Sequence, residues 1–92
     1  MSFLKRLFGG GAAEPKPVGD SVEYNGYTIQ ATPYREDGQY QTCGVVIKET
    51  GQARREHRFV RADRFPTAED AAAHAIRKGK QLVDEQGEAL FD

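Results

Sequence analysis

The chain has 92 residues, 38% of them hydrophobic and 29% charged, which is enough for one small domain with a modest core. Its 13 lysines and arginines nearly balance 14 aspartates and glutamates, which argues against a general nucleic-acid-binding protein with a broad basic surface. A single cysteine, Cys43, excludes an intrachain disulfide and suits a reducing compartment, so we expect a cytoplasmic protein. No apolar run approaches the ~20 residues that a membrane-spanning helix needs.

The first residues suggest a docking segment followed by a linker. The candidate docking residues are Phe3, Leu4, Lys5, Arg6, Leu7 and Phe8. At helical spacing their apolar side chains share one side and their basic ones the other, which suits a membrane surface or the groove of a protein partner. Alternatively, so short a segment is disordered, or packs on its own domain or on another copy. Glycines and prolines then predict a linker, so we divide the chain into residues 1–20, an N-terminal segment with linker, and 21–92, a folded domain.

The strongest local signal is a hairpin at Asn25-Gly26, a dipeptide that readily supplies the two positive φ angles of a type I′ turn. It lies between the alternating segments 22–24 and 27–31. Such a turn pairs these segments directly across from one another and places their large apolar side chains on one face of the sheet. The residues expected on that face are Val22, Tyr24, Tyr27, Ile29 and Ala31.

Two further strands are expected, and the hairpin is counted with them as the first of three strands, or its first segment forms a short arm of its own. Pro33 ends the first hairpin, and residues 35–38 predict a turn because they end in Asp-Gly. Residues 39–48 then predict a central strand that is apolar on both sides, and a turn at residues 50–52 leads to a third strand over 55–62.

One long helix is expected over residues 68–86, where apolar and small side chains recur at three- and four-residue spacing. Thr67 supplies the N-cap, and Gly79 allows close approach to the sheet. Leu90 and Phe91 either fold back onto the core or fray. The fold class is therefore α+β: a three-stranded antiparallel sheet (β-β-β-α) packed by one long C-terminal helix and preceded by a short amphipathic N-terminal segment.

Residues suited to catalysis or metal binding are few. Cys43 is expected to be a small core residue, and His57 and His74 to be solvated. Their spacing matches no ligand set and imposes no nucleophile–base pair. We therefore expect no catalytic residue, no metal site and no cofactor, and hence a protein that is not an enzyme.

Arginines gather in the predicted third strand and form a candidate patch for anions or nucleic acid, because guanidinium groups suit phosphate. The members of this patch are Arg54, Arg55, Arg58, Arg61 and Arg64. Strand alternation divides such side chains between two faces. The alternative is a solvated edge strand whose charges guard against aggregation.

Five segments together resemble the HlyU family of small bacterial proteins. They are residues 1–4, 7–10, 24–29, 57–63 and 78–87, and the resemblance covers nearly the whole chain. It implies a bacterial transcriptional regulator that acts through protein or nucleic-acid binding, with either DNA or a DNA-binding protein as its partner. The residues themselves leave an alternative, a non-enzymatic adaptor whose N-terminal segment docks on membrane or on a protein. A protein partner is expected on either interpretation, and the oligomeric state stays open.

Overall fold

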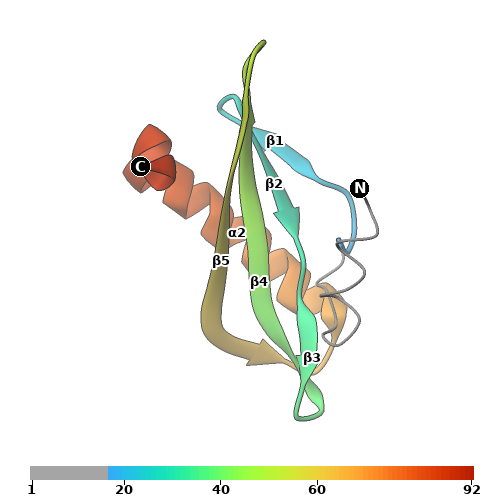
Figure 1. The fold of residues 1–92 in the computed structure, drawn as a ribbon. Coiled ribbons are helices and arrows are strands. Elements are labelled where there is room, and N and C mark those ends of the chain that lie inside the picture. The colour runs from blue at the N-terminus through green and yellow to red at the C-terminus, as the bar shows by residue number, and fades with distance from the viewer. Residues whose placement is uncertain (1–16) are drawn as a thin grey trace, which may run out of the picture.

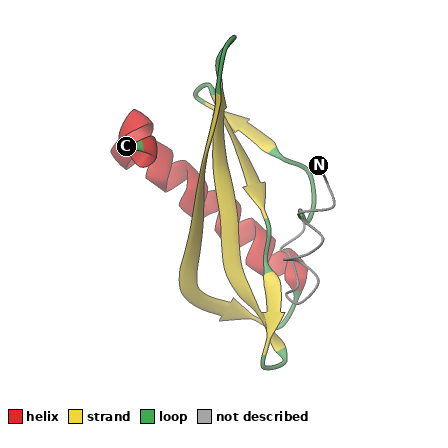
Figure 2. Ribbon diagram, in the orientation of Figure 1, coloured by secondary structure: helices red, strands yellow, loops and turns green. Residues whose placement is uncertain are grey.

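The computed structural model describes residues 17–92, which form an antiparallel sheet with one helix behind it (Figure 1). The strands are β1 (Val22–Tyr24), β2 (Tyr27–Ala31), β3 (Tyr34–Glu36), β4 (Gln39–Glu49) and β5 (Arg54–Phe65). They are followed by helix α2 (Ala68–Gln86) and a 3₁₀ turn, η1 (Gly87–Phe91), as Figure 2 shows. The α+β class, the antiparallel sheet and the single long C-terminal helix are confirmed.

Strand β4 lies at the centre of the sheet. One of its edges pairs with β2 and, further along, with β3, while its other edge pairs with β5. The short β1 lies outside β2. Among the described residues β5 pairs with β4 alone, so the longest strand of the sheet is also an outer strand.

The predicted count of three strands is wrong, because the sheet has five. The two strands of the first hairpin count separately, and β3 occupies part of the segment that we expected to be a turn. Asp37 and Gly38 suffice for that turn, with φ angles of 52° and 80°, which leaves Arg35 and Glu36 free to pair with β4. Pro33 separates β2 from β3 without removing the chain from the edge of β4.

The third predicted strand is also longer than expected, extending to Phe65 rather than ending at Ala62. A shift in the pairing register between β4 and β5 explains the difference. Gln41 pairs with Arg64, whereas Cys43, two residues on, pairs with Val60, four residues back. The extra residues on β5 form a bulge, which bends the strand and interrupts its alternation.

The structure confirms the hairpin turn that was predicted at Asn25-Gly26. Asn25 and Gly26 have φ angles of 49° and 85°, and Tyr24 pairs with Tyr27 across them. The apolar side of β2 is buried as its alternation predicted, with Ile29 fully inaccessible.

Helix α2 begins and ends at the predicted residues, and the side chain of Thr67 accepts a hydrogen bond from the backbone N–H of Asp70 at 3.1 Å. Gly79 provides the predicted close approach, since a Cβ built on it would lie 2.5 Å from Cγ2 of Ile29. Real side chains do not approach so closely, so the helix can sit this near β2 only with glycine here.

The C-terminus folds back onto the sheet, which decides between the two alternatives for its apolar residues. Leu90 is buried in the core, and the ring of Phe91 stacks on Tyr27 with centroids 6.3 Å apart. Lys48 completes this corner, because its Nζ lies 4.4 Å from the Tyr27 ring centroid and 3.5 Å from a carboxylate oxygen of Glu88.

Candidate nucleic-acid interface

All five candidate arginines lie in β5. A strand rises about 3.3 Å per residue, so Arg54 and Arg64 are separated by roughly 30 Å along it. The structure therefore does not gather the five guanidinium groups into one patch.

The arginines also divide between the two sides of the sheet. Val46 of β4 pairs with Ile29 on one side and His57 on the other, and Ile29 packs under α2, so His57 lies on the α2-facing side. Alternation along the straight part of β5 places Arg55 on that side as well, and Arg54 and Arg58 on the opposite side. Arg61 lies at the start of the bulge, and we assign it to the α2-facing side because Asp63, two residues on, contacts His74 of α2.

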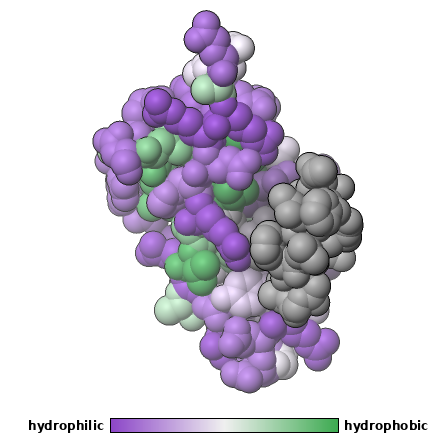
Figure 3. All heavy atoms as spheres, viewed as in Figure 1, coloured by the Kyte–Doolittle hydropathy of each residue, from purple (hydrophilic) through white to green (hydrophobic). Residues whose placement is uncertain are grey.

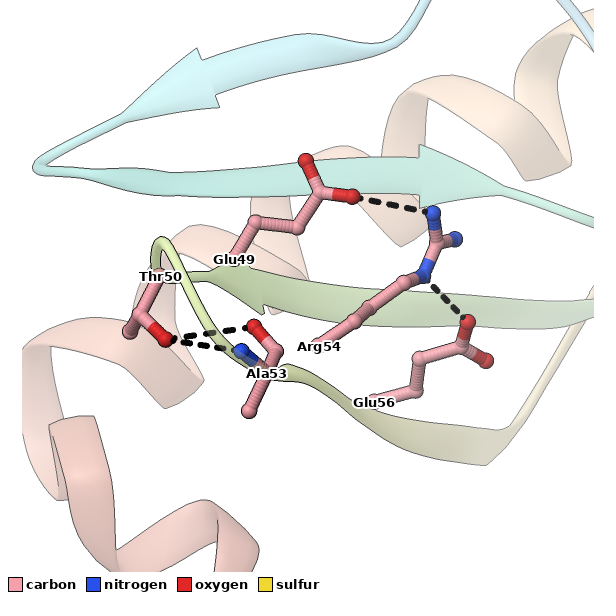
Figure 4. A network of polar contacts seen from close by, with 5 residues as sticks. All are labelled: Glu49, Thr50, Ala53, Arg54 and Glu56. Atoms are coloured by element: carbon pink, nitrogen blue, oxygen red, sulfur yellow. Dashed lines mark hydrogen bonds and ion pairs between the residues drawn. The ribbon is translucent and has the colours of Figure 1, made fainter.

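Arg54 is neutralised by two carboxylates on the side of the sheet away from α2, at the start of β5 (Figure 4). Its Nε lies 2.8 Å from Glu56, and its NH1 lies 3.3 Å from Glu49 on β4. The hydrogen bond to Glu56 is the main reason why the pKa of Arg54 is raised. Beside it, Thr50 closes the turn by accepting the backbone N–H of Ala53 at 3.1 Å.

Arg64 is engaged at the other end of β5, where it secures the bend. Its Nε donates to Oε1 of Gln41 at 2.8 Å, and its NH1 lies 3.6 Å from Asp37 in the β3–β4 turn. The amide of Gln41 in turn donates to the carbonyl of Arg61. These contacts bridge the bulge, so Arg64 has a structural role there.

The three remaining arginines are different. Among residues 17–92 the side chains of Arg55, Arg58 and Arg61 form no ion pair. These three residues are exposed, and no carboxylate of the described part of the chain lies within salt-bridge distance of their guanidinium groups, which suits them to an anionic ligand.

Helix α2 contributes to the same side of β5. Nε2 of His74 lies 2.9 Å from Oδ2 of Asp63 on β5, and its ring lies against Phe65 with centroids 5.2 Å apart. The prediction that His74 is solvated is wrong, since its side chain is only 18% exposed. Lys78 follows one helical turn later on the same stripe of α2 as His74, so we assign it to the side of the helix that carries His74.

We name Arg55, Arg61 and Lys78 the β5–α2 margin. Arg55 and Arg61 are cations of β5, Lys78 is a cation on the stripe of α2 that carries His74, and none of the three forms an ion pair within the described residues. Reasoning from sequence missed Lys78, because it considered only the arginines of β5 as a cationic surface. The signal that was available is its four-residue spacing from His74, but this has meaning only once His74 is known to contact β5.

The positive end of α2 does not extend this surface. Its first turn carries Glu69 and Asp70, whose carboxylates suit the helix dipole but repel phosphate. Any phosphate contact therefore belongs to the side chains of the margin and not to the helix N-terminus.

The polar side chains of two tyrosines connect the opposite end of α2 to the sheet. The hydroxyl of Tyr24 donates to both carboxylate oxygens of Asp84, at 2.9 and 3.0 Å, and this hydrogen bond is the main reason why its pKa is raised. Burial, and then the Glu88 carboxylate, raise the pKa of Tyr27, while Lys48 opposes that shift. These contacts hold the C-terminus on the sheet, away from the margin.

The remaining candidate site residues are Cys43, His57 and the N-terminal docking segment. Cys43 is a fully buried core residue, as predicted, and its sulfur accepts a hydrogen bond from Thr32 at 3.4 Å. His57 is half-buried, so the expectation that it is solvated is also wrong. The docking segment from Phe3 to Phe8 lies outside the described residues.

Residues 17–92 contain no group of three or more metal-binding side chains, and no helix with the length and hydropathy to cross a membrane. Hydrophilic residues dominate the face seen in Figure 3, with small, separate hydrophobic areas.

Comparisons with known proteins give one informative result. No curated protein and no solved structure matches the sequence. One family model matches residues 2–91, and its description is "Transcriptional activator HlyU". Proteins of this family activate transcription and are not catalysts, which confirms the expectation that the chain is not an enzyme. The match spans nearly the whole chain, which therefore belongs to the HlyU family of transcriptional activators.

Proposed function

We propose that this activator binds DNA directly, and that the β5–α2 margin (Arg55, Arg61 and Lys78) contacts the phosphate backbone. One observation carries the proposal: these cations form no ion pair among the described residues, whereas Arg54 and Arg64 on the same strand do. A cation that already has a carboxylate partner gains less from phosphate, because that partner must first be displaced.

The architecture favours a strand-based contact. Residues 17–92 contain one α-helix, so they provide no helix pair of the helix-turn-helix type. Strands do read DNA in other proteins, and the major groove admits a two-stranded ribbon. The hairpin of β4 and β5 has that form, and its tip projects beyond the rest of the sheet in Figure 1.

The overall charge limits how strong this contact is. With a formal net charge of −1, the chain has no general attraction to DNA, so affinity depends on a few local phosphate contacts. An activator that works this way acts where bacterial DNA is, in the cytoplasm. The N-terminal segment, with its amphipathic pattern, remains a second proposed contact for a protein partner or a membrane.

The test is fluorescence anisotropy of the full chain with a mixed-sequence duplex of about 30 base pairs, titrated between about 50 and 200 mM salt. We compare Arg61→Gln/Lys78→Gln with Arg54→Gln/Arg64→Gln, two variants that remove the same amount of charge. The first should bind more weakly, with a salt slope smaller by about 1.8, since each phosphate contact contributes about 0.9. The second should retain the parental slope, and circular dichroism of both variants checks that the bend secured by Arg64 is kept.

Two results would contradict the proposal. One is an equal loss of affinity in both variants, which would show that only net charge matters. The other is an absence of binding by the parent protein at about 100 μM and low salt, a range in which non-specific DNA binding is normally detectable.

A further inference from the structure

The outer edge of β5 has properties that the DNA contact does not use. Among the described residues it pairs with no other strand, although β5 is the longest strand of the sheet. From Arg54 to Val60 it runs in continuous register with β4, before the bulge begins. An exposed, regular edge of this length presents a row of backbone N–H and C=O groups that another strand can pair with.

The charges along this straight part are arranged in a self-complementary way. In antiparallel pairing of two copies about a two-fold axis, residues equally far from the axis lie opposite each other. With the axis at His57, Glu56 lies opposite Arg58 of the second copy, and Arg58 opposite its Glu56. The pairing then covers residues 54–60, the part of β5 that is in continuous register with β4.

Other registers are less favourable. An axis at Glu56 places that residue opposite its own copy, and an axis at Arg58 does the same for the arginine, so like charges meet directly. An axis at Phe59 sets Arg54 opposite Arg64 and extends the pairing into the bulged part of the strand, where the backbone departs from a straight ladder.

Val60 supports the same register. It is the large hydrophobic side chain that the described residues leave exposed, at 51%. With the axis at His57 it lies opposite Arg54 of the second copy, whose aliphatic stem can cover it. The pairing thus covers an exposed apolar group as well as joining opposite charges.

We infer that two copies of this chain associate through their β5 strands, antiparallel and centred on His57, to form one continuous sheet. The inference goes beyond the DNA contact. It leaves the cations of the margin available for phosphate, but in the dimer the β4–β5 hairpins are joined, so DNA would meet one continuous sheet and not a separate two-stranded ribbon. Arg55 and Arg61 of both copies remain on the α2-facing side of the joined sheet, so the dimer carries the margin twice on one face.

The first test is sedimentation equilibrium of the full chain without DNA, which keeps the result independent of the proposed function. We expect a species of twice the 10.2 kDa of one chain. Glu56→Arg should weaken dimerisation by on the order of tenfold, because two attractive pairs become repulsive. Glu56→Arg/Arg58→Glu should restore it, since the reversed pairs attract again, and circular dichroism of each variant checks that the fold is retained.

The second test fixes the register by crosslinking. Directly opposed residues have Cα atoms about 4.5–5.5 Å apart, within the range of a disulfide. His57→Cys should therefore form a disulfide-linked dimer, whereas Glu56→Cys and Arg58→Cys should crosslink only when mixed with each other. The native Cys43 is fully buried and serves as the background control.

A monomer at all concentrations would overturn the inference. So would a dimer that survives Glu56→Arg unchanged, or self-crosslinking of Glu56→Cys or Arg58→Cys in place of His57→Cys. A dimer without DNA binding would contradict only the proposed function, and DNA binding by a monomer would contradict only the dimer.

Discussion

Two parts of the molecule use their side chains in different ways: the contact between α2 and β2, and the outer strand β5. The first is made of small and buried residues, with Gly79, Ala72 and Ala75 of the helix on the apolar side of β2. The second is largely exposed and charged, and only Phe59 on it is buried. Close packing between α2 and β2 stabilises the fold, whereas most side chains of β5 are exposed to solvent.

The comparison shows how a domain this small separates stability from binding. Among the described residues, polar side-chain contacts hold β5 near its two ends, through Arg54 at the hairpin and through Asp63 and Arg64 at the bend. Between these ends, Arg55, Arg58 and Arg61 form no ion pair within residues 17–92. Substitutions at the helix contact should therefore change the free energy of unfolding, and substitutions at the β5–α2 margin should change binding.

The largest expected effect is that of Ile29→Ala. Ile29 is fully buried between α2 and the sheet, so its truncation removes apolar contacts and leaves a cavity. The free energy of unfolding should fall by about 2–5 kcal/mol, measured by urea denaturation. Val60→Ala, on exposed β5, is the matched control, and an equal loss there would break the distinction between the two regions.

Gly79→Ala should have the next largest effect. In an exposed helix position this change would stabilise the chain by about 1 kcal/mol, but here the added methyl collides with Ile29. We expect a net destabilisation of about 1–3 kcal/mol. The same substitution in an Ile29→Ala background should cost little, because the cavity receives the methyl. Additive losses in the double variant would show that the two side chains do not meet.

Alkaline pH should lower the free energy of unfolding through Tyr24 and Tyr27, which contact the C-terminal end of the chain. The pKa values of Tyr24 and Tyr27 are raised in the folded chain, so the folded state keeps protons that the unfolded state releases near pH 10. Stability is then retained below about pH 10 and falls as the pH rises towards the folded-state pKa values. Urea midpoints at neutral and alkaline pH should show this fall, and Tyr24→Phe/Tyr27→Phe should flatten it.

The smallest effect on stability is expected for Arg54→Gln. Its ion pairs with Glu49 and Glu56 are exposed, and such pairs contribute little. The urea midpoint at neutral pH should not change measurably. A large shift would mean that the start of β5 depends on these charges, and the two regions would then differ less than the structure indicates.

The parts of the fold that could be predicted are those with a local cause. Asn25-Gly26 makes its turn through its own φ angles, and Thr67 begins α2 by capping a neighbour. The sequence analysis missed strand β3 and the end of β5 because these segments are not determined by their own residues alone. Both depend on pairing with β4, including a bulge opposite Gln41 that no alternation pattern can show.

The sequence showed which arginines belong to the candidate interface, but not which of them have ion-pair partners. Five arginines were visible in the sequence, yet which of them are free depends on partners elsewhere in the chain, such as Asp37 for Arg64. The contribution of Lys78 depends on the contact of His74 with Asp63, which joins α2 to β5. Ion pairs between distant residues have no sequence period, so only the structure could separate the neutralised from the free arginines.

The separation of stability from binding is tested most directly by measuring both properties on two variants, Gly79→Ala and Arg61→Gln/Lys78→Gln. Urea unfolding and DNA anisotropy are recorded on the same preparations, at a temperature where both variants are folded. We predict that Gly79→Ala loses stability and keeps the parental affinity, and that the double variant does the reverse. If the double variant binds DNA as tightly as the parent, or if each variant changes both properties alike, the account is wrong.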